Sequence, residues 1–441
     1  GRINIIGNTK TRDTVVLREL TFNEGELLTT QKMDDSKRRV EGLGFFDQKE
    51  GVEWKINRVS DSQVDLDLIV KETRTGRGYG QLGYGGLDQD IQSPSATFNA
   101  SAGIQDTNFR GTGLSYNASV TYSRQDIGFN LGLANPRLFD RPIGVGLDFF
   151  HRHSNYDEYK NVTNTPKELI TGGLFTASFI PQFIIGSRFI FDIGAEHICY
   201  RNAIEARVPP NQKQFAKEFE QLTHRRFQPG TLAWLGATLI QDYRNHPVFP
   251  SKGYQWALYA KLGIPHGIDT FGFFKWEADA HWYTSLINDY NLILHLHGHV
   301  GVIAPMRCHT IPYRELFHIG GLSSVRGYLF GQIGPSVLGD SVGATKAFFI
   351  NTELLFPITR DLSIRGVIFY DGGAGWDTPD AQSINTKLLK NNRFNYRHAI
   401  GFGIRLTNPA PIRVEVGFKL DRNRKRGECL SEVYFNTAAE F

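Results

Sequence analysis

The sequence predicts a mainly β protein: a 16-stranded antiparallel transmembrane β-barrel over residues 75–441, preceded by one small α+β domain over residues 1–74. Three observations predict this class. Aromatic residues make up 12% of the chain, with 46 glycines and only 2 methionines, which is typical of strands and turns. No apolar run approaches the roughly 20 residues of a membrane-spanning helix, so a membrane role requires a closed barrel. From about Gly76, apolar and polar residues alternate with period two.

The first 74 residues combine helical and strand patterns. Residues 1–8 alternate like a short strand, residues 11–20 and 31–43 have helical periodicity, and residues 52–59 and 63–73 alternate again. The expected order is therefore β-α-α-β-β. The net charge of +4 over 441 residues indicates neither disorder nor a nucleic-acid-binding surface.

The barrel strands are two-sided along most of the remaining chain. In residues 274–282, Phe274, Trp276 and Trp282 share one face with two alanines, and Lys275 and Asp279 lie on the other face. A soluble β-sandwich alternates in the same way, so this pattern alone does not decide between a sandwich and a barrel.

Connection lengths supply the asymmetry that alternation lacks. Short turns alternate with longer polar loops along the chain. The short turns include 135–136, 245–247, 287–289, 357–361 and 408–409, and the long loops include 152–167, 202–227, 306–345, 376–395 and 421–431. Bacterial outer-membrane barrels have short periplasmic turns and long outer loops. An even number of strands then places residues 1–74 in the periplasm.

One long loop contains the segment Val325-Arg326-Gly327-Tyr328. An arginine in a glycine-rich loop needs partners if it leaves water. Strand alternation points two acids, Glu353 and Asp371, into the lumen, because their neighbours Leu354 and Tyr370 suit the lipid face. These carboxylates are the expected candidates to pair with the arginine.

That tetrad, preceded by Phe317-His318-Ile319-Gly320-Gly321, resembles the signature loop of BamA-type outer-membrane barrel assembly proteins. This superfamily also includes TamA and the two-partner secretion transporter FhaC. Residues 1–74 resemble a POTRA domain, notably at Ile6-Gly7-Asn8-Thr9 and Leu43-Gly44-Phe45-Phe46. The resemblance implies that the loop folds into the lumen and that Arg326 pairs with Glu353 and Asp371.

The resemblance also implies a function. The expected protein is a bacterial outer-membrane insertase, the core subunit of the barrel assembly machinery, which uses no cofactor and folds and inserts other barrels through a lateral gate. Its expected partners are unfolded outer-membrane proteins as substrates, BamD-like accessory lipoproteins at the POTRA domain and outer-membrane lipid, with no nucleic acid.

The two ends of the barrel sequence predict where such a gate lies. The last strand presents alternate apolar residues, and the first strand is rich in glycine, which weakens strand packing. The predicted gate residues are Gly78, Gly80, Leu82, Gly83, Phe435, Ala438 and Phe441. Family members often have a glycine where Ala438 stands.

Three alternatives remain open from the sequence. An FhaC-like transporter would export a polypeptide through the lumen, a passive porin would conduct through an open lumen, and an organellar relative would share the fold. The chain has no phosphate-binding loop, zinc-type cysteine spacing or hydrolase elbow, so no enzyme is expected.

Histidines and cysteines give weaker signals. His295, His297 and His299 share one face of a strand and have donor atoms suited to a transition metal. Ordinary polar lumen residues are the favoured interpretation, so no metal site is predicted. Cys199, Cys308 and Cys429 fall at the outer ends of strands, and their odd count leaves at least one thiol unpaired, with the pairing undetermined.

Overall fold

The structure is a computed structural model of the 441-residue chain. It describes residues 1–47, 51–60, 63–84, 98–123, 126–155, 167–181, 186–201, 227–246, 249–267, 270–287, 290–306, 309–337, 340–359, 363–379, 389–406, 412–422 and 428–436. Among the predicted gate residues, Ala438 and Phe441 lie outside these ranges, as does Cys308.

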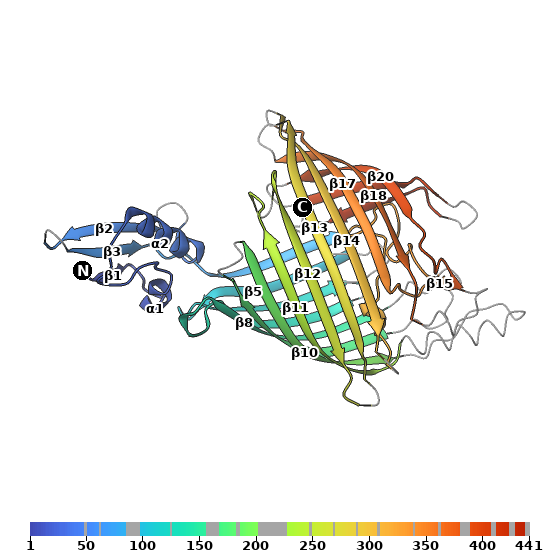
Figure 1. The fold of residues 1–441 in the computed structure, drawn as a ribbon, viewed down its shortest axis with the longest axis horizontal. Helices are drawn as coiled ribbons and strands as arrows, with labels where there is room; N and C mark the ends of the chain where they lie inside the picture. The colour runs from blue at the N-terminus through green and yellow to red at the C-terminus, as the bar shows by residue number, and fades with distance from the viewer. Residues whose placement is uncertain are drawn as a thin grey trace, which may run out of the picture. The chain divides into compact units, whose positions relative to one another are not determined.

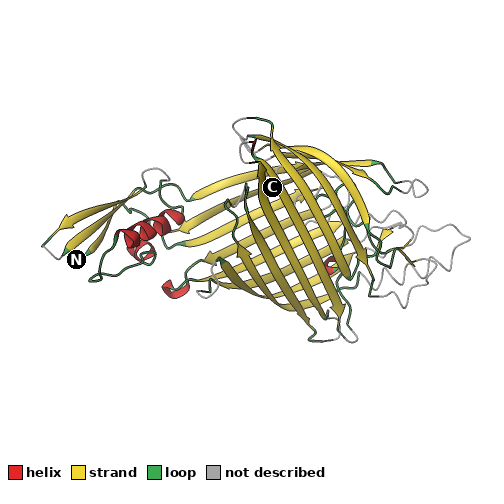
Figure 2. Ribbon diagram, turned by 45° about the horizontal axis from the view of Figure 1, so that its top comes forward, coloured by secondary structure: helices red, strands yellow, loops and turns green. Residues whose placement is uncertain are grey.

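The N-terminal domain has the predicted β-α-α-β-β order, with its helices drawn in red in Figure 2. Its elements are β1 (Ile3–Ile6), α1 (Asp13–Leu17), α2 (Thr30–Gly42), β2 (Val52–Arg58) and β3 (Val64–Val70). Strand β3 lies in the middle of the sheet, parallel to β1 and antiparallel to β2. Thr29 caps α2 by accepting a hydrogen bond from the Lys32 amide. The core of buried valines, leucine and phenylalanines lies between the helices and this sheet.

Residues 1–79 form a compact unit with residues 102–119 and 130–148. Within this unit the Arg12 amide donates to the Gly111 carbonyl at 2.9 Å, and the Asn108 amide group donates to Thr11 Oγ1 at 2.8 Å. A Cβ on Gly111 would lie 1.7 Å from the Lys10 carbonyl oxygen, so the contact requires glycine. The segment around Thr11 is therefore joined to the turn that follows β5.

Sixteen antiparallel strands form the closed barrel (Figure 1), which confirms the predicted class. They are β4 (Gly76–Tyr84), β5 (Phe98–Phe109), β6 (Leu114–Ser123), β7 (Asp126–Asn135), β8 (Ile143–Asn155), β9 (Lys167–Phe179), β10 (Ser187–Arg201), β11 (Gly230–Asp242), β12 (Gly253–Ile264), β13 (Phe273–Ile287), β14 (Leu292–Pro305), β17 (Lys346–Pro357), β18 (Ile364–Trp376), β20 (Arg397–Leu406), β21 (Ile412–Lys419) and β22 (Ser431–Asn436). Each strand pairs with its neighbour along the chain, and β22 returns to β4. A small separate sheet joins β15 (Ser336–Val337), β16 (Asp340–Ser341) and β19 (Leu389–Lys390).

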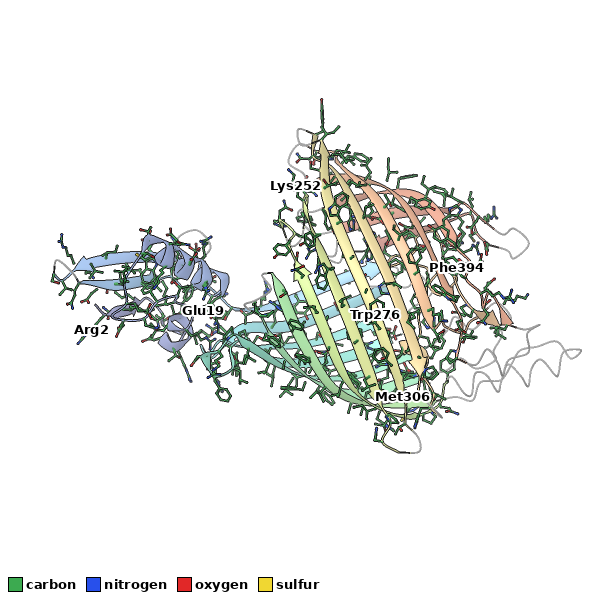
Figure 3. The ribbon with its side chains drawn as sticks, in the orientation of Figure 1. Arg2, Glu19, Lys252, Trp276, Met306 and Phe394 are labelled. Atoms are coloured by element: carbon green, nitrogen blue, oxygen red, sulfur yellow. The ribbon has the colours of Figure 1, made fainter. Side chains whose placement is uncertain are left out.

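The outer face of the barrel is apolar, as the alternation predicts. On β13, Phe274, Trp276 and Trp282 are 50%, 37% and 46% exposed, and Figure 3 labels Trp276 on the barrel wall. The same strand turns Asp279 and Lys275 to the inner face. Among the described residues, no helix is long and apolar enough to cross a membrane.

The connections follow the predicted alternation with two exceptions. The connection 243–252, on the side of the short turns, is longer than the connection 265–272 on the other side. Figure 3 shows Lys252, just before β12, and Met306, just after β14, at opposite ends of the strands. Lys252 belongs to the connection 243–252 and Met306 to the longest loop, 306–345. Strand β6 ends at Ser123 and β7 begins at Asp126, so a tight connection lies within the series of longer loops. Sequence alternation had not marked this hairpin.

Candidate functional site

The loop between β14 and β17 packs against the inner wall of the barrel. We call its described residues, 309–337 and 340–345, the lumen loop. It includes the short helix η4 (Tyr313–Glu315). Its apolar side chains share one core with the inner faces of the strands: Ile311, Leu316, Phe317, Ile319, Val325, Tyr328 and Ile333 from the loop, and Ile170, Ile198, Leu232, Trp234, Phe273, Ile303 and Phe349 from the strands. Burial of this apolar surface holds the loop in the lumen.

The signature tetrad is the most deeply buried part of the lumen loop. Val325 and Tyr328 are fully buried and Arg326 is 1% exposed. Gly327 has a φ of 94°, which favours glycine. A Cβ on Gly417 of β21 would lie 2.5 Å from the Gly327 nitrogen, so the absence of a side chain there lets the loop backbone contact the wall.

Arg326 contacts both predicted carboxylates. Its Nε and Nη2 donate to the two oxygens of Asp371 at 2.6 and 2.7 Å, a bidentate pair, and Nη1 donates to Glu353 Oε1 at 2.7 Å. The guanidinium carbon also lies 3.5 Å from the centre of the Phe369 ring. The structure therefore brings Arg326, Glu353 and Asp371 together at one point on the inner wall.

Three further charged residues complete this network, and none of them was a predicted site residue. Arg326 Nη1 also donates to Glu415 Oε2 at 2.8 Å, and Arg405 Nη2 donates to Glu353 Oε1 at 2.6 Å. Arg413 Nε lies 2.7 Å from Glu415 Oε1. We call these six residues the latch network: Arg326, Arg405, Arg413, Glu353, Asp371 and Glu415. Three cations balance three anions, which offsets much of the cost of burying them.

The tetrad also reaches the last strand through Tyr434. The Gly327 amide donates to Tyr434 Oη at 2.9 Å, and this hydroxyl donates to the Tyr328 carbonyl oxygen at 2.8 Å. The Tyr328 hydroxyl in turn donates to Asp421, and Arg397 lies over the Tyr328 ring, 5.0 Å from its centre. One loop segment therefore bonds to strands β17, β18, β21 and β22.

An earlier part of the lumen loop bonds to a second group of strands, β10, β12 and β13. Glu315 accepts a hydrogen bond from Lys261 Nζ of β12 at 2.6 Å and lies 3.6 Å from Lys275 Nζ of β13. Arg314 pairs with Glu196 of β10. The loop is thus held by ion pairs at two separate places on the inner wall.

We call the interface between β22 and β4 the seam. It has fewer paired residues, among those described, than the interfaces from β9–β10 to β21–β22. Strands β17 and β18 pair without interruption from Lys346↔Trp376 to Pro357↔Arg365. Within the described part of the chain, β22 and β4 share one registered pair, Phe435↔Tyr84. The neighbouring β21–β22 interface pairs from Arg413↔Asn436 to Phe418↔Ser431.

The first strand offers little side-chain packing at this seam. A Cβ added to Gly78 or Gly80 would have its nearest neighbour at 3.8 or 3.9 Å, so neither position is too crowded for a side chain. Leu82 is 56% exposed. These glycines lower the packing of β4 without being required by a close contact.

Residues 108–441 match the Omp85 superfamily domain. The chain belongs to the Omp85 superfamily. Residues 1–73 match the POTRA family, described as a surface antigen variable number repeat.

This Omp85 chain is 28% identical over 391 residues to the outer membrane protein assembly factor BamA of Neisseria meningitidis, covering 85% of the chain and 46% of that protein. The chain spans about half the length of the curated relatives it matches. A crystal structure of BamA from Haemophilus ducreyi lacking POTRA domains 1–3 superposes with a TM-score of 0.78 at 20% identity, covering 98% of this chain and 83% of that one. CdiB from Escherichia coli gives 0.62 at 13% identity, covering 99% and 75%. Both structural likenesses concern the fold.

Proposed function

We propose that this protein folds and inserts β-barrel proteins into the bacterial outer membrane, with the POTRA domain in the periplasm. Its substrates would be unfolded outer-membrane proteins, and the POTRA domain would receive them or BamD-like accessory lipoproteins. The family membership supports this class of activity, since the BamA proteins that the chain resembles are named as outer-membrane protein assembly factors.

The observation that carries the proposal is the difference between the seam and the wall. Each interstrand hydrogen bond contributes only about 0.5–1.5 kcal/mol net. An interface with few registered pairs and little side-chain packing therefore separates at low cost. The seam is an interface of this kind within the described residues, in contrast to the interfaces from β9–β10 to β21–β22, so we assign it the role of a lateral gate.

An open seam presents two strand edges to the membrane. Edge strands carry unpaired amide and carbonyl groups that template the addition of another strand. A substrate hairpin would pair with β4 or β22 and leave laterally, so no nucleotide is needed in this scheme. The lipid-facing side chains Val433 on β22 and Leu82 on β4, 59% and 56% exposed, mark the outer surface at this point.

The lumen loop holds one of the two seam strands, β22, in place. The latch network ties β17, β18, β20 and β21 into one body, and Tyr434 attaches β22 to it. Among the described residues, strand β4 has no contact with the signature tetrad. Opening would therefore move β4 away from a β22 strand that stays bound to the lumen loop.

The likeness to CdiB keeps export through the lumen as the competing function. That route requires the lumen loop to leave its apolar core and its ion pairs at both places on the wall. A passive porin faces the same obstruction. Lateral insertion leaves the lumen loop in place.

A disulfide across the seam separates these functions. The three native cysteines are first changed to serine, and Tyr84→Cys and Phe435→Cys are then combined, because their Cα atoms are registered partners. We expect the oxidised protein to remain folded and heat-modifiable on gels, to fail to insert a reporter barrel into liposomes, and to recover with reductant.

The matched control places the disulfide inside the wall, at the lipid-facing pair Ile400→Cys and Phe418→Cys of β20 and β21. This crosslink should leave insertion unchanged in both redox states. Full insertion by the oxidised seam variant would reject the lateral gate and favour passage through the lumen.

A further inference from the structure

Four ionisable side chains form a compact block on the inner faces of two neighbouring strands. Asp279 and His281 lie on β13, and His297 and His299 lie on β14. The register pairs Asp279 with His299 and His281 with His297. Because residues two apart share a face of a strand, all four side chains project into the same space. We call them the lumen tetrad.

The nitrogen atoms of the lumen tetrad converge on one carboxylate. His281 Nε2 lies 2.9 Å from Asp279 Oδ1, His297 Nε2 lies 2.9 Å from Asp279 Oδ2, and His299 Nδ1 lies 3.3 Å from the same oxygen. Donor atoms around a tetrahedral zinc ion with bonds of 2.0–2.1 Å lie roughly 3.3 Å apart. The side chains of Asp279 and His281 are 33% and 26% exposed, which gives an ion access from the lumen.

A chain of hydrogen bonds leads from this block to the latch network. Glu353 Oε2 lies 3.0 Å from His295 Nδ1, and His295 Nε2 lies 3.1 Å from His281 Nδ1. With the His281–Asp279 contact at 2.9 Å, three contacts link two carboxylates through two imidazoles.

The chain of contacts has room for one more cation than two neutral imidazoles supply. Glu353 is bound by Arg326 and Arg405, so it accepts as a carboxylate, and Asp279 also accepts. A neutral imidazole carries one N–H, so His295 and His281 together supply two N–H groups to three contacts. A metal ion bound between His281 Nε2 and Asp279 would satisfy the third contact.

We propose that Asp279, His281 and His297, whose ligand atoms lie within 4.8 Å of one another, bind a divalent transition-metal ion of the zinc class in the barrel lumen, with His299 contacting the Asp279 carboxylate. Imidazole nitrogens with one carboxylate suit zinc, copper or nickel, whereas calcium and magnesium prefer oxygen ligands alone. His295 Nε2 lies 3.1 Å from His281 Nδ1, and a metal-ligating histidine usually has such a hydrogen-bond partner at its other ring nitrogen. From the sequence, ordinary polar lumen residues were the favoured interpretation of His295, His297 and His299. The part played by Asp279 and His281 depends on the β13–β14 register, which the sequence pattern does not give.

A bound ion would crosslink β13 to β14 and complete the relay to the latch network. Its removal leaves the His281–Asp279 contact without a cation, which disfavours the arrangement of His295 against Glu353. Metal binding should therefore increase the resistance of the folded barrel to urea.

The test uses the full chain with its three cysteines changed to serine, because Cys199 Sγ lies 3.1 Å from His197 Nε2 and a thiol there would bind zinc independently. Zinc binding is measured by competition with a chromogenic chelator, and the site is probed by X-ray absorption at the zinc edge. We expect one equivalent of zinc with imidazole and oxygen ligands. His281→Gln and His297→Gln should abolish this binding, and His295→Gln should weaken it about 10–100-fold.

His151→Gln is the control, because this exposed histidine on β8 contacts Thr171 and lies on the outer face, away from the lumen tetrad. It should bind zinc like the parent. Failure of the parent to bind micromolar zinc would mean that a proton supplies the missing cation and would overturn the proposal. Equal binding in His281→Gln and His297→Gln would overturn it also. If these variants do not fold, the visible spectrum of cobalt bound to the parent decides, since four-coordinate geometry supports the site and six-coordinate geometry rejects it.

Discussion

The wall formed by β17, β18, β20 and β21 and the seam between β22 and β4 belong to one barrel but are stabilised differently. The wall has long registered pairing and a buried ionic network on its inner face. The seam has one registered pair within the described residues and a glycine-rich strand on one side. Backbone pairing alone closes the barrel, whereas pairing together with buried charge holds it rigid. A gate is therefore expected at the seam, where the buried ionic network no longer adds to the backbone pairing.

The largest effect is expected from Arg326→Ala, which removes the cation at the centre of the wall. Three buried carboxylates would face two guanidinium groups, and removing one partner of a buried ion pair costs about 3–5 kcal/mol. The free energy of unfolding in lipid vesicles should fall by about this amount, and protease should cut within the lumen loop. The exposed Arg393→Ala is the control and should change stability by less than about 0.5 kcal/mol. A wild-type unfolding curve for Arg326→Ala would remove the basis for treating the wall as ionically braced.

A smaller effect is expected where Gly327 of the signature tetrad contacts Gly417 of β21. In Gly417→Ala the new Cβ would lie 2.5 Å from the Gly327 nitrogen, so the loop backbone must shift. Overpacking of this kind costs about 1–3 kcal/mol. Gly298→Ala on β14 is the matched control, because its Cβ would have no neighbour within 4 Å. Equal stability of the two variants in urea would show that the loop does not rest on β21.

Tyr434→Phe tests the link between the signature tetrad and β22, the strand at the seam, by removing the hydroxyl that joins them. The change removes the hydroxyl that accepts from Gly327 and donates to Tyr328, at a cost of about 1–2 kcal/mol. Hydrogen exchange should rise in residues 431–436 and stay constant in β17 and β18. Tyr290→Phe, at a position 71% exposed, should change neither. Unaltered exchange in β22 would separate the loop from the gate.

The smallest effect is expected outside both regions, at Glu72 in the POTRA domain. Burial opposes ionisation of this carboxyl, but hydrogen bonds from Thr11, Thr9 and Lys10 prevail and lower its pKa from 4.5 to about 2. Since the folded-state pKa is the lower one, the stabilisation is complete above about pH 4.5 and is lost as the pH falls toward 2.

Glu72→Gln should therefore lower the stability of the POTRA domain by about 1 kcal/mol at neutral pH and flatten its acid dependence. Hydrogen exchange of β3, measured across this pH range, reports the change without involving the barrel. The exposed Glu53→Gln is the control. An acid dependence that survives in Glu72→Gln would assign the effect to another carboxyl.

The sequence predicted what depends on local pattern. Helical and strand periodicities gave the order of the N-terminal elements, and alternation placed Glu353 and Asp371 on the inner face. Arg413 and Glu415 are two residues apart and so share one face of their strand, but alternation does not give the height of a residue along the barrel. The height at which strands meet depends on their stagger, which no local pattern encodes.

The remaining misses have the same physical origin. Glu415, Arg405 and Tyr434 lie near the signature tetrad because β21, β20 and β22 bring them to the level of Arg326. His281 meets His297 because of the β13–β14 register. A sequence pattern that identifies faces therefore predicts candidate partners, and only the sheet selects among them.

Hydrogen exchange of the full chain in lipid nanodiscs tests the proposed gate most directly, because it reports the opening of backbone pairs at each interface. Residues 76–84 and 431–436 are compared with residues 346–357 and 364–376 at the same pH and temperature. We expect exchange at the two seam strands to be at least about tenfold faster than at the wall, corresponding to an opening free energy lower by about 1.4 kcal/mol. Equal protection of the seam and the wall would contradict the lateral gate.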